Sequence, residues 1–143
     1  PLESVAHLDC LVVRVPVGLA AIEEVPLSAA RVRGRAVLFH TGWDRHWRTD
    51  AYFENHPHLT ARAAEWLVKA GAVFVGIDSF NIDSTATGER PVHSTLVARD
   101  IPICEHMRGL DAVPDDGGRF SAVPVKVLGF GSFPVRAFVV ADR

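Results

Sequence analysis

The side chains best suited to bind a metal or transfer protons are the seven histidines of this 143-residue chain. A His-x-x-x-His pair starting at His40 would need a second imidazole at position 44, which is Asp44, so His40 is interpreted as a residue at a strand end. His56 and His58 flank a proline, and no nearby carboxylate completes a ligand set, which favours a structural loop. Three further histidines have no patterned partner: His7, His46 and His106.

His93 and Glu105 differ from the other candidates because a short helix and the strand after it could bring their side chains together. His93 lies near the predicted start of the helix, and Glu105 lies at the end of the strand. Imidazole and carboxylate both suit zinc, manganese or iron, and a metal bound in this way could activate water for hydrolysis. Two ligands make a weak motif, so a surface or packing role for both residues stays open.

Other catalytic signatures are absent from the sequence, which has no Gly-x-Ser-x-Gly elbow, P-loop or Rossmann glycine fingerprint. Cys10 and Cys104 lie far apart without Cys-x-x-Cys spacing, so both are interpreted as buried apolar residues in a reducing compartment. Asp78 and Asp83 sit at and just beyond a predicted strand end, where functional residues concentrate. An Asx turn explains either aspartate equally well.

The elements that must position these residues are predicted from apolar runs and from capping residues. Thr60 is a good N-cap, and Gly71 is placed to end the helix that follows. Strands are expected at 8–15, 36–40, 72–77 and 101–105, a helical turn at 27–32, a helix at 91–98, a structured loop with one helical turn at 43–58, and an antiparallel pair at 120–128 and 135–140. Strands outnumber helices, and the last two have a hairpin-like connection. The sequence therefore predicts a mixed α/β (α+β) domain with a mixed sheet and flanking helices.

Charge and composition exclude several classes of partner. With a formal charge of −2 and scattered basic residues, the chain has no positive electrostatic field that would attract nucleic acid or anionic lipid. No apolar run approaches the roughly 20 residues needed to span a bilayer. With 48% hydrophobic residues, the chain is expected to form one soluble, cytoplasmic domain.

Several short motifs follow one another in a specific order along nearly the whole chain. They are His40-Thr-Gly-Trp43, Tyr52, His56-Pro57, the segment 63–67, the segment 75–78, Pro91-Val-His93, Ile103-Cys-Glu105 and the segment 134–137. In this order they resemble the cyclase family of metal-dependent hydrolases, which includes bacterial kynurenine formamidase and isatin hydrolase. The resemblance implies a cyclase-like swivelling β/β/α fold and hydrolysis of amide (C–N) bonds in small molecules.

The resemblance also assigns a role to the pair identified above. Family members hold a divalent metal with an upstream His-x-Gly-Thr-His-x-Asp motif, and a downstream histidine and glutamate complete the site. The downstream residues match His93 and Glu105, which are therefore implied as ligands of zinc or manganese. The upstream motif has no counterpart here, because the His40-Thr-Gly string aligns with a separate Thr-Gly-Trp segment.

The missing motif has consequences for the domain and its activity. Residues 1–143 are expected to form a single cyclase-like domain that is N-terminally truncated relative to the family. Such a chain alone would bind the metal weakly or not at all. The catalytic histidine of the family follows the missing motif, so the catalytic residue of this chain stays unknown.

Two functions are open at this point. The first is a formamidase-like amide hydrolase whose missing segment is cleaved, left out or supplied by another chain. The second is a non-catalytic protein that keeps the scaffold as a binding or interaction module. Trp43 and Phe80 are predicted walls of the substrate site, although core packing explains both equally well. The family also implies a homodimer.

Overall fold

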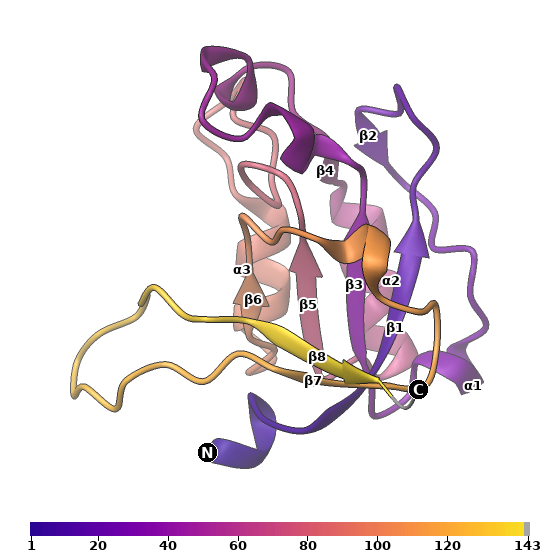
Figure 1. Cartoon of the computed structure of the whole chain (residues 1–143), viewed down its shortest axis with the longest axis vertical. Coiled ribbons are helices and arrows are strands. Elements are labelled where there is room, and N and C mark those ends of the chain that lie inside the picture. Colours follow the sequence, from indigo (N-terminus) through magenta and orange to yellow (C-terminus); the bar gives the residue numbers. More distant parts are fainter. Residues whose placement is uncertain (142–143) are drawn as a thin grey trace.

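The computed structural model of the chain describes residues 1–141 and contains a six-stranded sheet in the order β6-β5-β3-β1-β7-β8 (Figure 1). Four strands run parallel to one another: β1 (Leu8–Arg14), β3 (Ala36–His40), β5 (Phe74–Ile77) and β6 (Ile103–Cys104). β7 (Gly118–Ser121) pairs antiparallel with β1, and β8 (Phe138–Ala141) pairs antiparallel with β7. These last two strands cross the front of the parallel strands at a steep angle, so the sheet curls. The prediction of a mixed sheet is confirmed.

Helices cover one face of the parallel strands. α2 (Ala61–Ala70) and α3 (Pro91–Val97) lie behind the sheet in Figure 1, and the short α1 (Ala29–Val32) lies beside them. The ends of α2 are as predicted: the Thr60 hydroxyl accepts a hydrogen bond from the Ala63 N–H at 3.4 Å, and Gly71 ends the helix with a φ of 82°. On α2, Ala63, Ala64 and Leu67 are fully buried against the sheet.

A second apolar cluster fills the other face of the sheet, beneath the segment that carries Met107 and the 3₁₀ turn Leu110–Ala112. Met107 approaches β5 so closely that a Cβ on Gly76 would lie 2.5 Å from its sulfur. A larger residue at this position would require the side chains of Met107 and Leu38 to move. The contact seats the chain that follows β6 directly against the end of β5.

The predicted hairpin differs most from the structure. β7 begins at Gly118, two residues before the predicted start, and ends at Ser121 rather than at position 128. Residues 122–137 have no regular hydrogen-bonded structure and extend away from the sheet in Figure 1. Pro124 has no N–H for a ladder, and no partner strand lies beside this segment among the described residues. The antiparallel pairing is therefore confirmed, but the predicted strands are too long and the hairpin-like connection between them is longer than predicted.

Two smaller features were also missed by the sequence analysis. β2 (Ala21–Ile22) and β4 (His58–Leu59) form a separate two-stranded parallel sheet. The 43–58 loop contains two 3₁₀ turns, Trp43–His46 and Asp50–Phe53, instead of one helical turn. Within residues 1–141, none of the helices has the length and apolar character needed to cross a bilayer.

Candidate functional site

The polar candidates gather where three neighbouring parallel strands end. Thr41 follows β3, Asp78 follows β5 and Glu105 follows β6. Because parallel strands point the same way, these three residues meet at one edge of the sheet. In α/β folds this edge is where ligands usually bind.

The first cluster at this edge contains the predicted pair. His93 Nε2 lies 3.6 Å from Glu105 Oε1, so α3 and β6 do bring the two side chains together. Two ligands of a tetrahedral metal with bonds of about 2.1 Å are separated by about 3.4 Å. The observed spacing fits one ion between the two atoms. Whether they bind a metal stays a prediction.

Asp83 orients the imidazole of this pair. Its buried carboxylate accepts hydrogen bonds from the Val92 N–H at 2.7 Å and the His93 N–H at 3.0 Å, at the start of α3. The same carboxylate lies 2.7 Å from His93 Nδ1. An ionised carboxylate can only accept, so Nδ1 of a neutral His93 carries the proton and the Nε2 lone pair faces Glu105. Carboxylates of this kind commonly support metal-binding histidines.

Two other contacts agree with this assignment. Arg90 Nη2 lies 3.5 Å from His93 Nε2, and a guanidinium can only donate, which requires a lone pair on that nitrogen. The Ile82 N–H donates to Glu105 Oε1 at 2.7 Å and holds the carboxylate in place. The sequence analysis left Asp83 open between an Asx turn and a functional residue. The structure makes it the support of His93.

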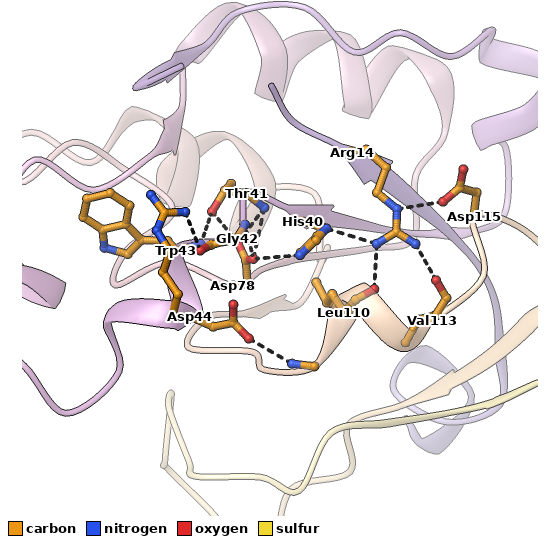
Figure 2. A network of polar contacts seen from close by, with 12 residues as sticks. Arg14, His40, Thr41, Gly42, Trp43, Asp44, Asp78, Leu110, Val113 and Asp115 are labelled. Carbon is orange, nitrogen blue, oxygen red and sulfur yellow. Dashed lines mark hydrogen bonds and ion pairs between the residues drawn. The ribbon is translucent and has the colours of Figure 1, made fainter. Parts of the chain in front are cut away.

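A second cluster, formed by His40, Asp44 and Asp78, lies nearby, with one ligand atom from each residue within 4.8 Å of the others. Figure 2 shows that Arg14 reaches the opposite side of the imidazole, where its Nη1 lies 3.0 Å from His40 Nδ1. Because Arg14 can only donate, Nδ1 must accept. The proton of a neutral His40 is then on Nε2, which points toward Asp78 Oδ2 at 3.9 Å.

The carboxylate of Asp78 is already saturated by the protein. It is fully buried and accepts hydrogen bonds from the Thr41 N–H at 2.9 Å, the Gly42 N–H at 2.7 Å and the Thr41 hydroxyl at 2.5 Å. Burial raises the pKa of Asp78, and these donors oppose that rise. Asp78 thus holds the turn at Gly42, whose φ is 70°, and directs the chain into Trp43.

The two clusters suit a divalent metal to different degrees. The His40 cluster presents an N–H instead of a lone pair, and its buried carboxylate is occupied. His93 and Glu105 present a lone pair and a carboxylate that face each other. The pair of His93 and Glu105 fits a metal better, although it supplies only two of the four ligands that a closed site needs.

The predicted aromatic walls lie in different surroundings. Phe80 is half-buried, and four rings pack around it at centroid distances from 5.0 to 6.2 Å: Tyr52, Phe53, His56 and His106. Trp43 contacts His46 and Arg45, and its indole N–H donates to the Tyr52 carbonyl at 3.0 Å. Tyr52 therefore contacts both predicted wall residues, Trp43 and Phe80. Their role in substrate binding stays a prediction.

Comparison with known proteins identifies relatives of the whole domain. A family model described as Putative cyclase matches residues 7–84, more than half of the chain. The kynurenine formamidase of Bordetella avium is 29% identical over 139 residues, which are 96% of this chain and 61% of that protein. The kynurenine formamidase of Bordetella petrii is 29% identical over 93 residues, which are 65% of this chain and 42% of that protein.

Solved structures agree on the fold. An isatin hydrolase bound to the product analogue thioisatinate superposes with a TM-score of 0.83 at 21% identity, covering 99% of this chain and 63% of that chain. A structure titled as a potential metal-dependent hydrolase with cyclase activity gives a TM-score of 0.72 at 24% identity, covering 97% of this chain and 67% of that one. The cyclase-like fold is confirmed. The chain spans less than two thirds of the length of both formamidases and of the isatin hydrolase.

Proposed function

Because this chain belongs to the putative cyclase family, we propose that it acts as a metal-dependent hydrolase of an amide C–N bond in a small molecule, as a formamidase does. The observation that carries this proposal is the pairing of His93 Nε2 with Glu105 Oε1, with Asp83 fixing the tautomer. The relatives that it resembles are named kynurenine formamidases, and a formamide contains such a bond. No contact among residues 1–141 favours the alternative of a non-catalytic binding module.

Each residue of the pair has a definite task in this proposal. Zinc or manganese, when bound by His93 and Glu105, would supply a Lewis acid for the amide carbonyl and for water. Asp83 keeps the Nε2 lone pair of His93 directed at the ion position. The Ile82 N–H restrains Glu105, and Trp43 and Phe80 are the proposed walls for the substrate. Two protein ligands bind a divalent ion weakly, so low affinity is expected for this chain alone.

Metal titration of the chelator-treated protein tests the proposal. Calorimetry with Zn²⁺ and with Mn²⁺ should detect binding to the parent, and this binding should decrease in both His93→Ala and Glu105→Gln. His7→Ala is the matched control, because His7 precedes β1 and so lies at the opposite end of the parallel strands from the site. Unchanged affinity in His93→Ala would refute the ligand assignment.

Hydrolysis of N-formylkynurenine by the metal-loaded protein tests the reaction itself. We expect turnover that the same two substitutions abolish. Metal binding without any turnover would contradict the hydrolase and favour the binding module.

We further propose that the protein is a homodimer that covers the segment 122–140. Seven of the twelve exposed large hydrophobic residues in the described part of the chain lie there: Val123, Val125, Val127, Leu128, Phe130, Phe138 and Val140. β8 is also the outermost strand, so one row of its backbone groups is open. Exposed apolar patches of this kind support association.

Sedimentation equilibrium tests the dimer. Leu128→Lys should shift the parent from dimer toward monomer, whereas Val17→Lys, at an exposed residue elsewhere, should not. A parent that is monomeric at all concentrations would refute the proposal.

We also propose that the protein is cytoplasmic. Cys10 and Cys104 are both free and buried, which fits a reducing compartment. Burial raises the pKa of each thiol to about 11, so neither is a reactive thiolate at neutral pH.

A further inference from the structure

His106 directly follows Glu105 and is held in an uncommon backbone conformation. Its φ is 57°, in the left-handed region that favours glycine or asparagine. The His106 N–H donates to the Ser79 carbonyl at 3.1 Å, and the Met107 N–H donates to the Ile77 carbonyl at 3.2 Å. The backbone is therefore fixed over the end of β5, while the side chain of His106 remains exposed.

The hydroxyl of Tyr52 sets the tautomer of this imidazole. Tyr52 is 1% exposed, and burial raises the pKa of its hydroxyl above the usual range, so the group keeps its proton. Its hydroxyl oxygen lies 3.1 Å from His106 Nδ1, its one hydrogen-bond partner within residues 1–141. A buried hydroxyl needs an acceptor for its proton, so Tyr52 donates to Nδ1. A neutral His106 then carries its own proton on Nε2.

The exposed Nε2–H of His106 lies among aromatic rings. The imidazole centroid is 5.7 Å from that of Phe80, 5.9 Å from that of Tyr52 and 6.2 Å from that of Trp47. Within the described residues, Nε2 has no hydrogen-bond partner. The structure thus presents an oriented N–H donor beside aromatic faces and next to Glu105.

The charges around this donor indicate the chemistry of its acceptor. Asp78, Asp44 and Glu105 act on the Tyr52 hydroxyl as nearby negative charges, and Arg108, whose guanidinium lies 5.8 Å from the Trp47 ring centroid, opposes them with one positive charge. The three carboxylates outnumber this cation and disfavour an anionic group at the same place. A neutral carbonyl oxygen attached to an aromatic ring satisfies both the donor and the rings.

We propose that His106 is a specificity-determining residue that donates its Nε2–H to a carbonyl oxygen of an aromatic amide, whose ring packs against Phe80 and Trp47. The proposal rests on the proposed function for the class of substrate. Tyr52 acts through His106 and is a positioning residue. The donor and the rings belong to this chain, so binding can be measured without metal.

The test compares two neutral probes that differ by one formyl group. Formanilide carries the carbonyl, and aniline has the same ring without it. In chelator-treated protein, ligand-observed NMR titration should give formanilide a dissociation constant about tenfold lower than that of aniline, the size of one well-oriented hydrogen bond. His106→Gly should reduce this ratio to about one and leave aniline binding nearly unchanged. Tyr52→Phe should reduce the ratio partly, because the imidazole loses its fixed tautomer.

Stability separates this role from a merely structural one. His106→Gly leaves the buried Tyr52 hydroxyl without its acceptor, so it is also made in the Tyr52→Phe background, where glycine relaxes the left-handed backbone and should lose the carbonyl preference without melting below Tyr52→Phe itself. His106→Asn keeps a residue that tolerates this conformation and is the second variant if the glycine destabilises the turn. A parent that binds both probes equally, or a His106→Gly variant that keeps the tenfold ratio, would overturn the proposal.

The outcome can be distinguished from failure of the proposed function. His93→Ala removes a proposed metal ligand but not the donor, so it should lower metal affinity and retain the preference for formanilide. If metal binding is absent and the preference persists, the metal proposal fails and the role of His106 stands.

Discussion

Two histidines at the same edge of the sheet lie beside carboxylates, yet they present opposite atoms to them. The Nδ1 of His93 faces the Asp83 carboxylate, whereas the Nδ1 of His40 faces the Arg14 guanidinium. When the partner of Nδ1 is a hydrogen-bond acceptor, Nδ1 carries the proton and Nε2 has the lone pair. When the partner of Nδ1 is a donor, Nδ1 has the lone pair and the proton of a neutral imidazole is on Nε2. Proximity of the same residue types therefore does not define a metal site. The group on the far side of the imidazole decides it.

The two clusters also differ in what their carboxylates do. Asp78 is occupied by the backbone and hydroxyl of Thr41 and by the Gly42 N–H, so it stabilises a turn. Glu105 accepts one backbone hydrogen bond, from Ile82, and faces His93. We interpret the cluster of His40, Asp44 and Asp78 as the structural cluster and the cluster of His93, Glu105 and Asp83 as the functional cluster. Substitutions in each cluster can break or sharpen this distinction.

The largest expected effect is on stability, in the structural cluster. Asp78→Ala leaves buried donors of Thr41 and Gly42 without an acceptor, and should lower the free energy of unfolding by about 3 kcal/mol. Urea denaturation measures this loss. Asp44→Asn is the control, because Asp44 is only half-buried and accepts one backbone hydrogen bond, from Gly109. An equal loss in both variants would contradict the special role of Asp78.

The next effect is on metal affinity, in the functional cluster. Asp83→Asn removes the negative charge that supports the Nδ1–H of His93, and its amide group cannot accept from both the Val92 N–H and the His93 N–H, so the imidazole is held less firmly toward Glu105. Zn²⁺ or Mn²⁺ affinity should fall about 10- to 100-fold, as for other supports of metal-binding histidines. Calorimetry measures the affinity, and ¹⁵N NMR of the imidazole reports the tautomer.

The same measurement on His40→Ala gives the matched comparison. This substitution should leave metal affinity unchanged, because His40 presents an N–H in the structural cluster. If His40→Ala weakens metal binding more than Asp83→Asn does, the roles of the two clusters are reversed.

The smallest effect is a pH dependence of stability caused by a third histidine, His56. Within the described part of the chain, its ring nitrogens contact neither a carboxylate nor a guanidinium. Its ring nitrogens face the Pro57 carbonyl and the Thr85 hydroxyl. Burial lowers the pKa of His56 below its usual value of 6.5, and the Pro57 contact opposes this shift. The unfolded chain then binds the proton more tightly. Stability should fall as the pH decreases from 6.5 toward the folded pKa, with a slope of at most about 1.4 kcal/mol per pH unit.

His56→Gln should flatten this slope, as measured by urea denaturation between pH 5 and pH 8, while His7→Gln should leave it in place. A parent whose stability does not change across this range would rule out a buried neutral imidazole at position 56.

Much of the scaffold could be predicted from local pattern. The apolar run 36–40 forms β3 at the predicted residues, and Thr60 and Gly71 bound α2 as expected. The failure at 120–128 has a clear cause, because strand length depends on a pairing partner as well as on apolar residues. β7 pairs with β8 over four residues, and the alternating pattern beyond Ser121 has no strand to pair with in the described chain.

The candidate site could be predicted only in part. His93 and Glu105 were found from the order of elements and from family resemblance, and their approach is confirmed. Tyr52 and His106 were missed as a unit because 54 residues separate them, and neither has a spacing that signals the other. The left-handed backbone of His106 also has no signature in a histidine.

The sequence by itself determined the strand, helix, strand order that carries the site, because capping, alternation and apolar runs act between near neighbours. It also determined which side chains could bind a metal. Only the tertiary structure decided which nitrogen of each histidine is free, because that depends on partners brought from elsewhere in the chain. Arg14 reaches His40 from 26 residues away, and Asp83 reaches His93 from across the preceding loop. A tautomer is set by the atom at hydrogen-bond distance, and folding alone places that atom.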